Sequence, residues 1–226
     1  MMGTKQRTGY TTKVTAMRQT LLHISLLMIT TLGPGAVNAD SGRFVPLDAQ
    51  GQPMATAQRE RGIWPCVLDR RTGLVWEAKT RTPGLHYRHN TYRWFDPNRT
   101  RNGGLAGEPG SLRCADGTQQ ICDTHRLVKT VNAEGLCGAH DWRLPRREEL
   151  RSLVDYLVPY PGPTLDTRAF PNAVGQFHWS ADSKASEPLE AWGIGFAHGF
   201  DYAYFKTNRV HVRLVSSHYQ LGRWQP

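Results

Sequence analysis

The chain has 226 residues, of which 39% are hydrophobic and 21% are charged. This composition is typical of a globular protein, and the length suffices for one well-packed domain. The mean hydropathy of -0.52 excludes a polytopic membrane protein. The formal net charge is +9, but four basic residues and no acidic residue precede Asp40, so the remainder carries a charge near +5. Such a moderate charge does not indicate a nucleic-acid partner, and we expect none.

The N-terminal segment has the features of an export signal. Basic residues up to Arg18 precede the apolar run 21–29, which is too short to span a bilayer. Helix-breaking residues and Val37-Asn38-Ala39 follow, as they do before a signal-peptidase site. We therefore predict a signal peptide over residues 1–39, with Met17 as an alternative start and an uncleaved membrane anchor as the alternative interpretation. The protein is then expected to be secreted or periplasmic, with no stable membrane span after cleavage.

The remainder divides by composition into three parts. Residues 40–62 are polar and without clear periodicity, and they predict an N-terminal arm or linker. Residues 63–217 form the predicted domain, and residues 218–226 form a C-terminal tail.

All four cysteines follow the predicted signal. They are Cys66, Cys114, Cys122 and Cys137. An even number in an exported chain favours two disulfides, for which three pairings exist. Cys114 and Cys122 flank a turn-rich segment, so we predict a local bridge there and a long-range bridge from Cys66 to Cys137. The long bridge would stabilise the fold by roughly 4 kcal/mol in the chain-entropy model. A zinc site is the alternative, although the spacings match no common zinc pattern.

The first half of the domain predicts a hairpin, a long loop and a helix. Apolar residues on both sides of the turn 69–73 indicate a hairpin over residues 64–76. Residues 79–120 are rich in Gly, Asn, Arg and Thr and predict a long ordered loop region. A helix is expected to begin after Asp123, a good N-cap, and to end before Gly135.

A second helix is predicted after Pro145, a residue suited to a helix entrance. Glu148 and Glu149 occupy its first turn, where the exposed backbone N–H groups favour negative charge. One face carries apolar residues at helical spacing: Leu150, Leu153, Val154 and Leu157.

Short β-like runs follow a Pro-rich linker. They are Phe177–Ser180, Ala191–Phe196, Asp201–Lys206 and Arg209–Val215, and they predict a meander of short antiparallel strands. Two helices followed by such a sheet define an α+β domain, stapled here by disulfides.

Several motifs match a known family in order and spacing. They are Thr72-Gly-Leu-Val-Trp76, Trp142-Arg-Leu-Pro145, Phe170-Pro-Asn172, Trp179-Ser180 and Val212-Arg-Leu-Val215. Over roughly Trp64 to Ser217 the chain resembles the Lcl C-terminal domain family, named for the C-terminal domain of a bacterial collagen-like adhesin. The resemblance implies a C-type-lectin-like α+β fold, export, and binding rather than catalysis. In the named adhesin the domain forms trimers and recognises sulfated glycans.

This sequence departs from the family pattern in two respects. It has no Gly-X-Y repeat, so no triple helix would impose trimerisation, although a homo-oligomer stays open. Arg146 stands where the family usually has a capping Thr, a loss worth about 1 kcal/mol. We therefore expect Arg146 to serve surface contacts, with neutral sequence drift as the alternative.

Calcium is the first cofactor to consider in a lectin-like fold. Glu187-Pro188-Leu189 lacks the third residue of the calcium-dependent sugar motif. Oxygen-bearing side chains alternate in the loop, but an EF-hand would need Gly at Arg101 and Glu at Gly107. These side chains are Asp96, Asn98, Thr100 and Asn102. An Asn/Gly-rich turn is the simpler interpretation, a structural calcium ion is the alternative, and we expect no cofactor.

No recognised catalytic motif is present in the sequence. There is no Gly-x-Ser-x-Gly and no His-Glu-x-x-His. Neither of two candidate sites has support from spacing or motif. The first is a catalytic triad drawn from Ser180, Asp182, His198 and Asp201, and the second is a metal site formed by His178, His198 and His211. We expect no enzymatic activity.

Basic residues form the predicted binding surface. Arginine's planar fork suits sulfate, phosphate and carboxylate groups. We predict that arginines of the long loop and of the second helix start converge, with Trp94 or Tyr92 stacking on sugar faces; a solvated basic surface is the alternative. The predicted ligand-binding residues are Arg99, Arg101, Arg146, Arg147, Arg151 and Trp94.

Three functions are compatible with these observations. The leading hypothesis is an adhesin-like module that recognises an anionic glycan. The second is an accessory protein of a cell-envelope assembly that binds a protein partner. The third is a metal-dependent enzyme built on the histidines.

Overall fold

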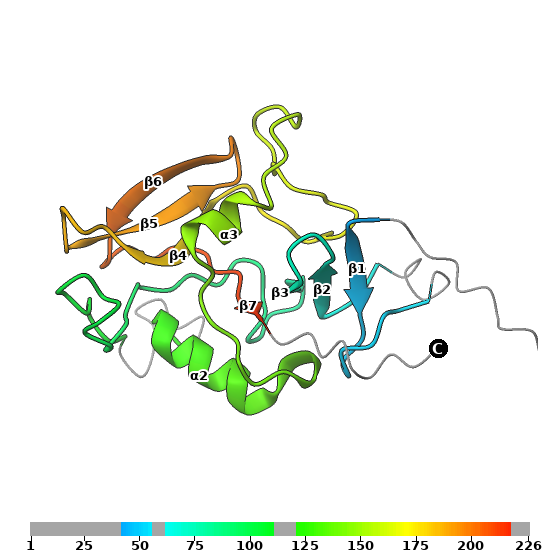
Figure 1. Cartoon of the computed structure of the whole chain (residues 1–226), viewed down its shortest axis with the longest axis horizontal. Helices are drawn as coiled ribbons and strands as arrows, with labels where there is room; N and C mark the ends of the chain where they lie inside the picture. Colours follow the sequence, from blue (N-terminus) through cyan, green and yellow to red (C-terminus); the bar gives the residue numbers. More distant parts are fainter. Residues whose placement is uncertain (1–41, 56–61, 111–120, 218–226) are drawn as a thin grey trace, which may run out of the picture. The chain divides into compact units, whose positions relative to one another are not determined.

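A computed structural model describes residues 42–55, 62–110 and 121–217. These residues form two antiparallel sheets, two α-helices and one short 3₁₀ helix (Figure 1). The predicted mixed α/β class with antiparallel strands is thereby confirmed. Within these ranges, no helix has the length and apolar character that a membrane crossing requires. The predicted signal peptide and C-terminal tail lie outside the described residues.

The first sheet has the strand order β1-β2-β3-β7. Its strands are β1 (Phe44–Leu47), β2 (Cys66–Asp69), β3 (Leu74–Glu77) and β7 (Val215–Ser216). β2 and β3 form the predicted hairpin, whose turn closes through Gly73 N and Asp69 O at 2.8 Å. Gly73 has φ +72°, a backbone conformation that favours glycine.

β1 comes from the segment predicted as an arm. It pairs with β2 and buries Val45 and Leu47 completely. Arg43, just before it, clamps the buried Asp69 carboxylate with Nε and Nη2 at 3.0 and 2.7 Å. Such a short strand of four residues carries no periodic pattern, and its burial follows from its pairing with β2 and from its packing in the core.

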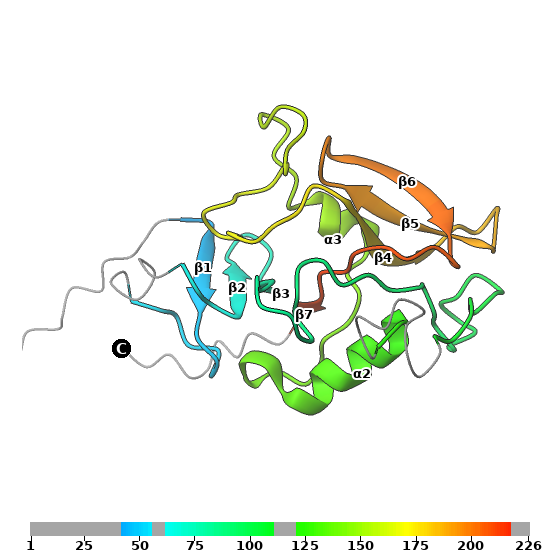
Figure 2. The ribbon, with the colours of Figure 1, turned by 180° about the vertical axis from the view of Figure 1, so that it is seen from behind.

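The second sheet has the order β4-β5-β6 and confirms three predicted strands. They are β4 (Phe177–Ser183), β5 (Glu190–Gly195) and β6 (Phe200–Phe205). The fourth predicted strand, Arg209–Val215, is wrong as a continuous element. It makes isolated bridges, runs along β4 with His211 N donating to Phe177 O, and becomes a strand only at β7 (Figure 2).

The first predicted helix is confirmed as α2 (Thr124–Glu134). The Asp123 carboxylate accepts from Arg126 N at 2.8 Å, which caps the N-terminus. Gly135 follows the last turn with φ +71°. The 3₁₀ helix η1 (Leu136–Gly138) then carries Cys137 towards the first sheet.

The second predicted helix is much shorter than its apolar pattern suggests. α3 spans only Arg147–Arg151, and Leu157 is 92% exposed. The Ser152 carbonyl accepts from the guanidinium groups of Arg43 and Arg71, each at 2.7 Å. Because that carbonyl is turned to the arginines, it does not continue the helical ladder, and the prediction that the helix reaches Leu157 is wrong.

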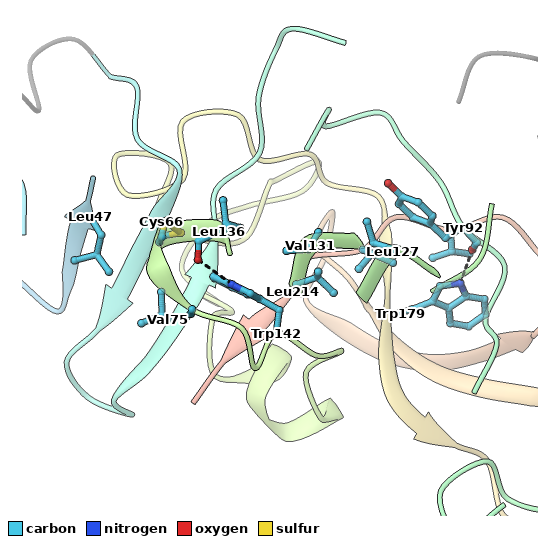
Figure 3. Close-up of a cluster of buried hydrophobic side chains, with 14 of the residues drawn as sticks. Leu47, Cys66, Val75, Tyr92, Leu127, Val131, Leu136, Trp142, Trp179 and Leu214 are labelled. Atoms are coloured by element: carbon cyan, nitrogen blue, oxygen red, sulfur yellow. Dashed lines mark hydrogen bonds between the residues drawn. A yellow bond between two sulfur atoms is a disulfide. The ribbon is translucent and has the colours of Figure 1, made fainter. Parts of the chain in front are cut away.

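The core is built around the family motifs. Trp142 and Trp179 are buried, and their indole N–H groups donate to Leu136 O and Tyr92 O at 3.0 and 2.8 Å (Figure 3). Trp76 is also buried, as expected, whereas Trp192 is only half-buried.

The predicted long-range disulfide, Cys66–Cys137, is confirmed. It joins β2 to η1 beside the core (Figure 3). Cys122 is also disulfide-bonded, and its predicted partner Cys114 lies outside the described residues.

Candidate functional site: an arginine pocket

The start of α3 is organised by one carboxylate. Glu149 accepts from Arg146 N at 2.7 Å and from both terminal nitrogens of Arg143 at 2.7 and 2.8 Å. Burial raises the pKa of Glu149, but the hydrogen bonds from Arg143 and from Arg146 N outweigh it, so this pKa lies below its ordinary value. The side chain of Arg146 has no acceptor atom with which to cap the helix. Glu149, in the first turn, instead accepts the backbone N–H of Arg146.

The loop after Trp94 is ordered by its own side chains. Asp96 accepts from Arg101 Nε at 3.1 Å, and Asn98 Oδ1 accepts from Thr100 N at 3.0 Å. Asn102 Oδ1 accepts from Gly104 N at 3.0 Å. The oxygens considered for calcium are thus engaged in local turns.

The buried ammonium group of Lys206 binds backbone carbonyl groups of this loop. Lys206 is 2% exposed, and its ammonium donates to Asn102 O and Leu105 O at 2.9 and 2.6 Å. It also lies 4.3 Å from the centre of the Trp94 ring. Burial lowers the pKa of Lys206 to about 8. The carbonyl groups of the loop are therefore held by a lysine at the end of β6.

The loop and the start of α3 enclose a pocket of about 610 Å³. We call it the arginine pocket. Its charged lining consists of Arg101, Arg143, Arg146, Asp96 and Glu149, and its ring-bearing residues are Trp94, Phe95 and His125. One predicted arginine of the loop, Arg101, and one at the helix start, Arg146, therefore line the same pocket.

The three arginines of the pocket differ in what they already bind. Arg101 faces Asp96, and Arg143 faces Glu149. Arg146 is exposed, and among the described residues its guanidinium makes no hydrogen bond or ion pair. The lining thus carries one positive charge in excess of its carboxylates, on a side chain whose donors are open to a ligand.

The other predicted arginines lie outside the pocket. Arg147 stacks on Trp192 at 4.6 Å and pairs with Asp201 at 3.4 Å. Arg151 pairs with Glu148. Arg99 is exposed in the same loop as Arg101 but does not line the pocket. The predicted cluster at the helix start is therefore divided, because successive helical residues point in different directions.

The predicted stacking role of Trp94 is wrong. The ring belongs to the wall of the pocket, yet the residue is 0% exposed, and its indole N–H donates to Ser180 O at 2.9 Å. Tyr92 is 1% exposed and is equally unavailable. The other two ring-bearing residues of the lining, Phe95 and His125, lie edge to face with their ring centres 5.8 Å apart.

Sequence reasoning missed Arg143 and His125 as pocket residues. Arg143 belongs to the Trp-Arg-Leu-Pro motif, which the sequence analysis treated as structural only. His125 lies in the first turn of α2, a helix that was predicted from its capping residues and given no binding role. An arginine between two apolar residues, the buried Trp142 and the half-buried Leu144, was the available signal, because strand-like alternation turns it away from the core.

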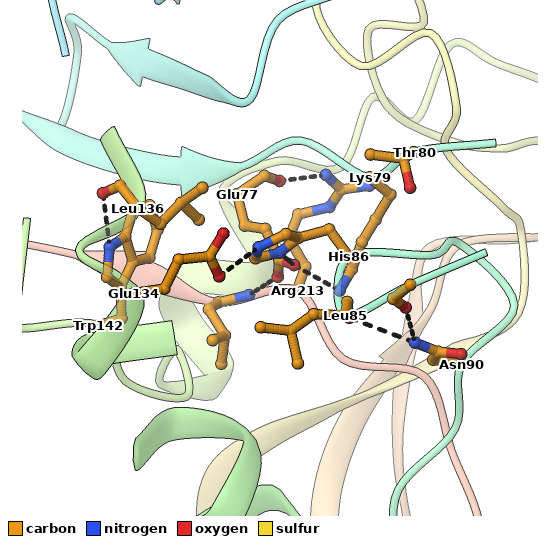
Figure 4. Close-up of polar contacts among 12 residues, drawn as sticks. Glu77, Lys79, Thr80, Leu85, His86, Asn90, Glu134, Leu136, Trp142 and Arg213 are labelled. Carbon is orange, nitrogen blue, oxygen red and sulfur yellow. Dashed lines mark hydrogen bonds and ion pairs between the residues drawn. The ribbon is translucent and has the colours of Figure 1, made fainter. Parts of the chain in front are cut away.

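A second polar cluster lies in the interior. The carboxylate of Glu77 is buried and accepts from Lys79 Nζ and from Leu214 N at 2.7 and 3.0 Å, and it contacts His86 Nδ1 at 2.7 Å (Figure 4). Arg213 donates to the Glu77 carbonyl at 2.6 Å. Burial raises the pKa of Glu77, but Lys79 and His86 outweigh it and hold this pKa far below its ordinary range.

This cluster, which we call the Glu77 cluster, joins β3 to the segment before β7. Lys79 and Arg213 are buried with it, and none of its residues lines the arginine pocket. Its place at the ends of two family motifs indicates a structural role.

The histidines considered as metal ligands do not form one site. His178 and His211 lie with ring centres 5.5 Å apart, whereas His198 contacts Phe200 and Tyr202. Over the ranges that the structure covers, no group of three or more His, Cys, Asp or Glu residues is arranged to hold a metal ion.

Comparison with protein families identifies the class of this protein. The family model for the Lcl C-terminal domain matches residues 65–216. The chain therefore belongs to the Lcl C-terminal domain family, and the match spans both sheets from β2 to β7. A comparison with curated proteins finds no match.

Proposed function

We propose that this protein is an exported, non-enzymatic binding protein that recognises an anionic, sulfated glycan in the arginine pocket. One observation carries the proposal. Arg101 and Arg146, from a loop and a helix start far apart in the sequence, line one pocket, and the Arg146 guanidinium is unpartnered among the described residues. Guanidinium groups bind sulfate and carboxylate oxygens through paired, charge-assisted hydrogen bonds.

The pocket suits a sugar acid or sulfate better than a simple ion. Arg143 and Arg101 are held by Glu149 and Asp96, so their planes are already oriented before a ligand arrives. Such preorganisation lowers the cost of binding. The rings of Phe95 and His125 supply an apolar border against which a sugar face packs.

The family membership supports two finer proposals. The fold is of the C-type-lectin-like kind, an α+β arrangement in which helices accompany two small antiparallel sheets. The protein works outside the cytoplasm, at the surface or in the periplasm, because its disulfides require an oxidising compartment.

The test is retention on immobilised heparin across a salt gradient. The parent chain should be retained, and Arg146→Ala should elute at clearly lower salt. Arg151→Ala is the matched control, because this arginine is also exposed on α3 but lies outside the pocket and pairs with Glu148.

The outcomes separate the hypotheses. Equal elution of Arg146→Ala and Arg151→Ala would show that retention reflects overall basic charge rather than the pocket. Flow-through of the parent at physiological salt would contradict the anionic-glycan proposal and favour a protein partner in the cell envelope.

A further inference from the structure

β6 is an edge strand whose outer side is unpaired in the described structure. In the sheet order β4-β5-β6 it has a neighbour on one side only. Lys206 N donates to Leu189 O on the β5 side. Since hydrogen-bonded pairs alternate in an antiparallel ladder, Phe200, Tyr202 and Tyr204 bond to β5.

The backbone groups of the alternate residues therefore point away from the sheet. Asp201 and Ala203 each present an N–H and a C=O to the open edge, and neither finds a backbone partner among the described residues. An unpaired row of this kind is a template for another strand.

Three usual protections of an exposed edge strand, namely lysine, proline and a bulge, are missing from β6. The strand has no proline and no bulge towards β5, and its register is continuous over six residues. Its one charge, Asp201, is turned to Arg147 on the α3 side. Phe200 and Phe205 are 64% and 55% exposed. Natural edges usually carry lysine, proline or a bulge, so β6 has the character of a pairing edge.

The opposite face of β6 carries a row of aromatic rings. Tyr202 and Tyr204 flank Phe177 at 4.4 and 4.6 Å, with Phe200 continuing the row towards the strand start. The row fits because β5 has glycine beneath it: a Cβ at Gly193 would lie 2.5 Å from the Phe177 ring.

The arrangement of this row is self-complementary. If two β6 strands pair antiparallel about Tyr202, Asp201 faces Ala203 of the other copy, and all the free backbone groups of both residues are satisfied. Tyr202 then faces its own counterpart, and Phe200 faces Tyr204. These are non-hydrogen-bonded pairs, in which side chains lie closest and aromatic partners stabilise the sheet.

We propose that β6 pairs edge to edge with β6 of a second copy of this chain, about a two-fold axis at Tyr202, to form a dimer with a continuous six-stranded sheet. The self-complementary register favours a second copy over an unrelated strand, because no like charges meet and every aromatic residue of the row finds an aromatic partner. The contact is isologous and therefore closed, so it does not propagate into fibres.

The first experiment measures the mass of the chain in solution by sedimentation equilibrium. The parent should have twice the mass of one chain. Ala203→Pro should be monomeric, since proline removes an outward N–H that β5 does not use. Ala203→Ser keeps that N–H and should remain dimeric, which makes it the matched control.

A second variant tests the register without weakening the contact. Tyr202→Cys places two cysteines opposite each other on the axis, at a separation that a disulfide can bridge. Mild oxidation should give a covalent dimer, whereas Tyr204→Cys alone should not, because it faces Phe200. A monomeric parent at all concentrations, a dimeric Ala203→Pro, or cross-linking by Tyr204→Cys and not by Tyr202→Cys would each overturn the proposal.

Discussion

Arg143 and Glu149 form a two-point ion pair that joins the Trp-Arg-Leu-Pro segment to the first turn of α3. Nη1 and Nη2 of the arginine donate to the two carboxylate oxygens at 2.7 and 2.8 Å. The pair raises the pKa of Arg143, chiefly through the hydrogen bond to Glu149. It therefore fixes the side of the arginine pocket from which Arg146 projects.

Loss of this pair should destabilise the domain moderately. Glu149→Ala removes the acceptor of Arg143 and of Arg146 N, and we expect a loss of about 1 to 2 kcal/mol in the free energy of unfolding. Urea titration followed by tryptophan fluorescence measures it. Glu148→Ala is the control, because Glu148 is 58% exposed and pairs only at the surface; its loss should stay within about 0.5 kcal/mol.

Substitutions in the Glu77 cluster should destabilise the domain more than substitutions at Glu149. Glu77→Ala leaves the buried Lys79 ammonium without its carboxylate, so we expect a loss of about 3 to 5 kcal/mol in the free energy of unfolding. Glu134 contacts the same His86 from the other side at 3.1 Å, but its side chain is 47% exposed. Glu134→Ala should therefore cost little, and an equal cost for both variants would contradict the buried-pair interpretation.

Acid should weaken the fold through His211. Burial, with Lys79 and His89 nearby, lowers the pKa of His211 from 6.5 to about 4, and burial also lowers that of the neighbouring His178. The unfolded chain then binds more protons than the folded one between pH 6.5 and about 4, so stability falls as the pH falls through that window.

The variant His211→Gln checks this pH dependence. The difference in urea midpoint between pH 7 and pH 4.5 should be smaller for the variant than for the parent. An unchanged difference would assign the acid sensitivity to other groups. His140→Gln provides the control, because His140 is exposed and follows η1 in the chain.

Lys206 should matter for anion binding although it does not line the arginine pocket. Lys206→Met removes the donor to Asn102 O and Leu105 O, and we expect a loss of about 1 to 3 kcal/mol in stability. Faster hydrogen exchange across residues 102–107 and earlier elution from heparin should accompany it, because the loop carries Arg101. Lys184→Met is the control, because it removes an ammonium paired with Glu190 outside this loop. It should leave the hydrogen exchange of residues 102–107 and the elution from heparin unchanged.

Much of the fold was predictable because its signals are local. Asp123 and Gly135 bound α2 as capping chemistry requires, and the hairpin turn at Gly73 closes as expected. The pattern failed where a distant side chain intervened. Leu157 has the spacing of a helix face, but Arg43 and Arg71 bind the Ser152 carbonyl, and α3 ends six residues earlier, at Arg151.

The candidate site was only partly predictable for the same reason. Residue type indicated that arginines would bind an anion, and Arg101 and Arg146 do meet. Their neighbours Arg99 and Arg151 do not join them, and Trp94 is buried. Side-chain direction decides which of several exposed arginines share a pocket. The positions of basic residues in the sequence do not reveal that direction.

The sequence by itself determined the family, the mixed α/β class and the caps of α2, since each depends on residue type and short spacing. It also predicted the Cys66–Cys137 bridge, because pairing the two close cysteines Cys114 and Cys122 leaves these two for a long-range bond. Only the tertiary structure decided that Glu149 orients Arg143, that Lys206 supports the loop of Arg101, and that the edge of β6 is open. The Lys206 contacts join residues more than 100 positions apart, and the Arg143–Glu149 pair and the open edge depend on how the backbone turns in space, so their geometry arises only when the two sheets and the loops pack together.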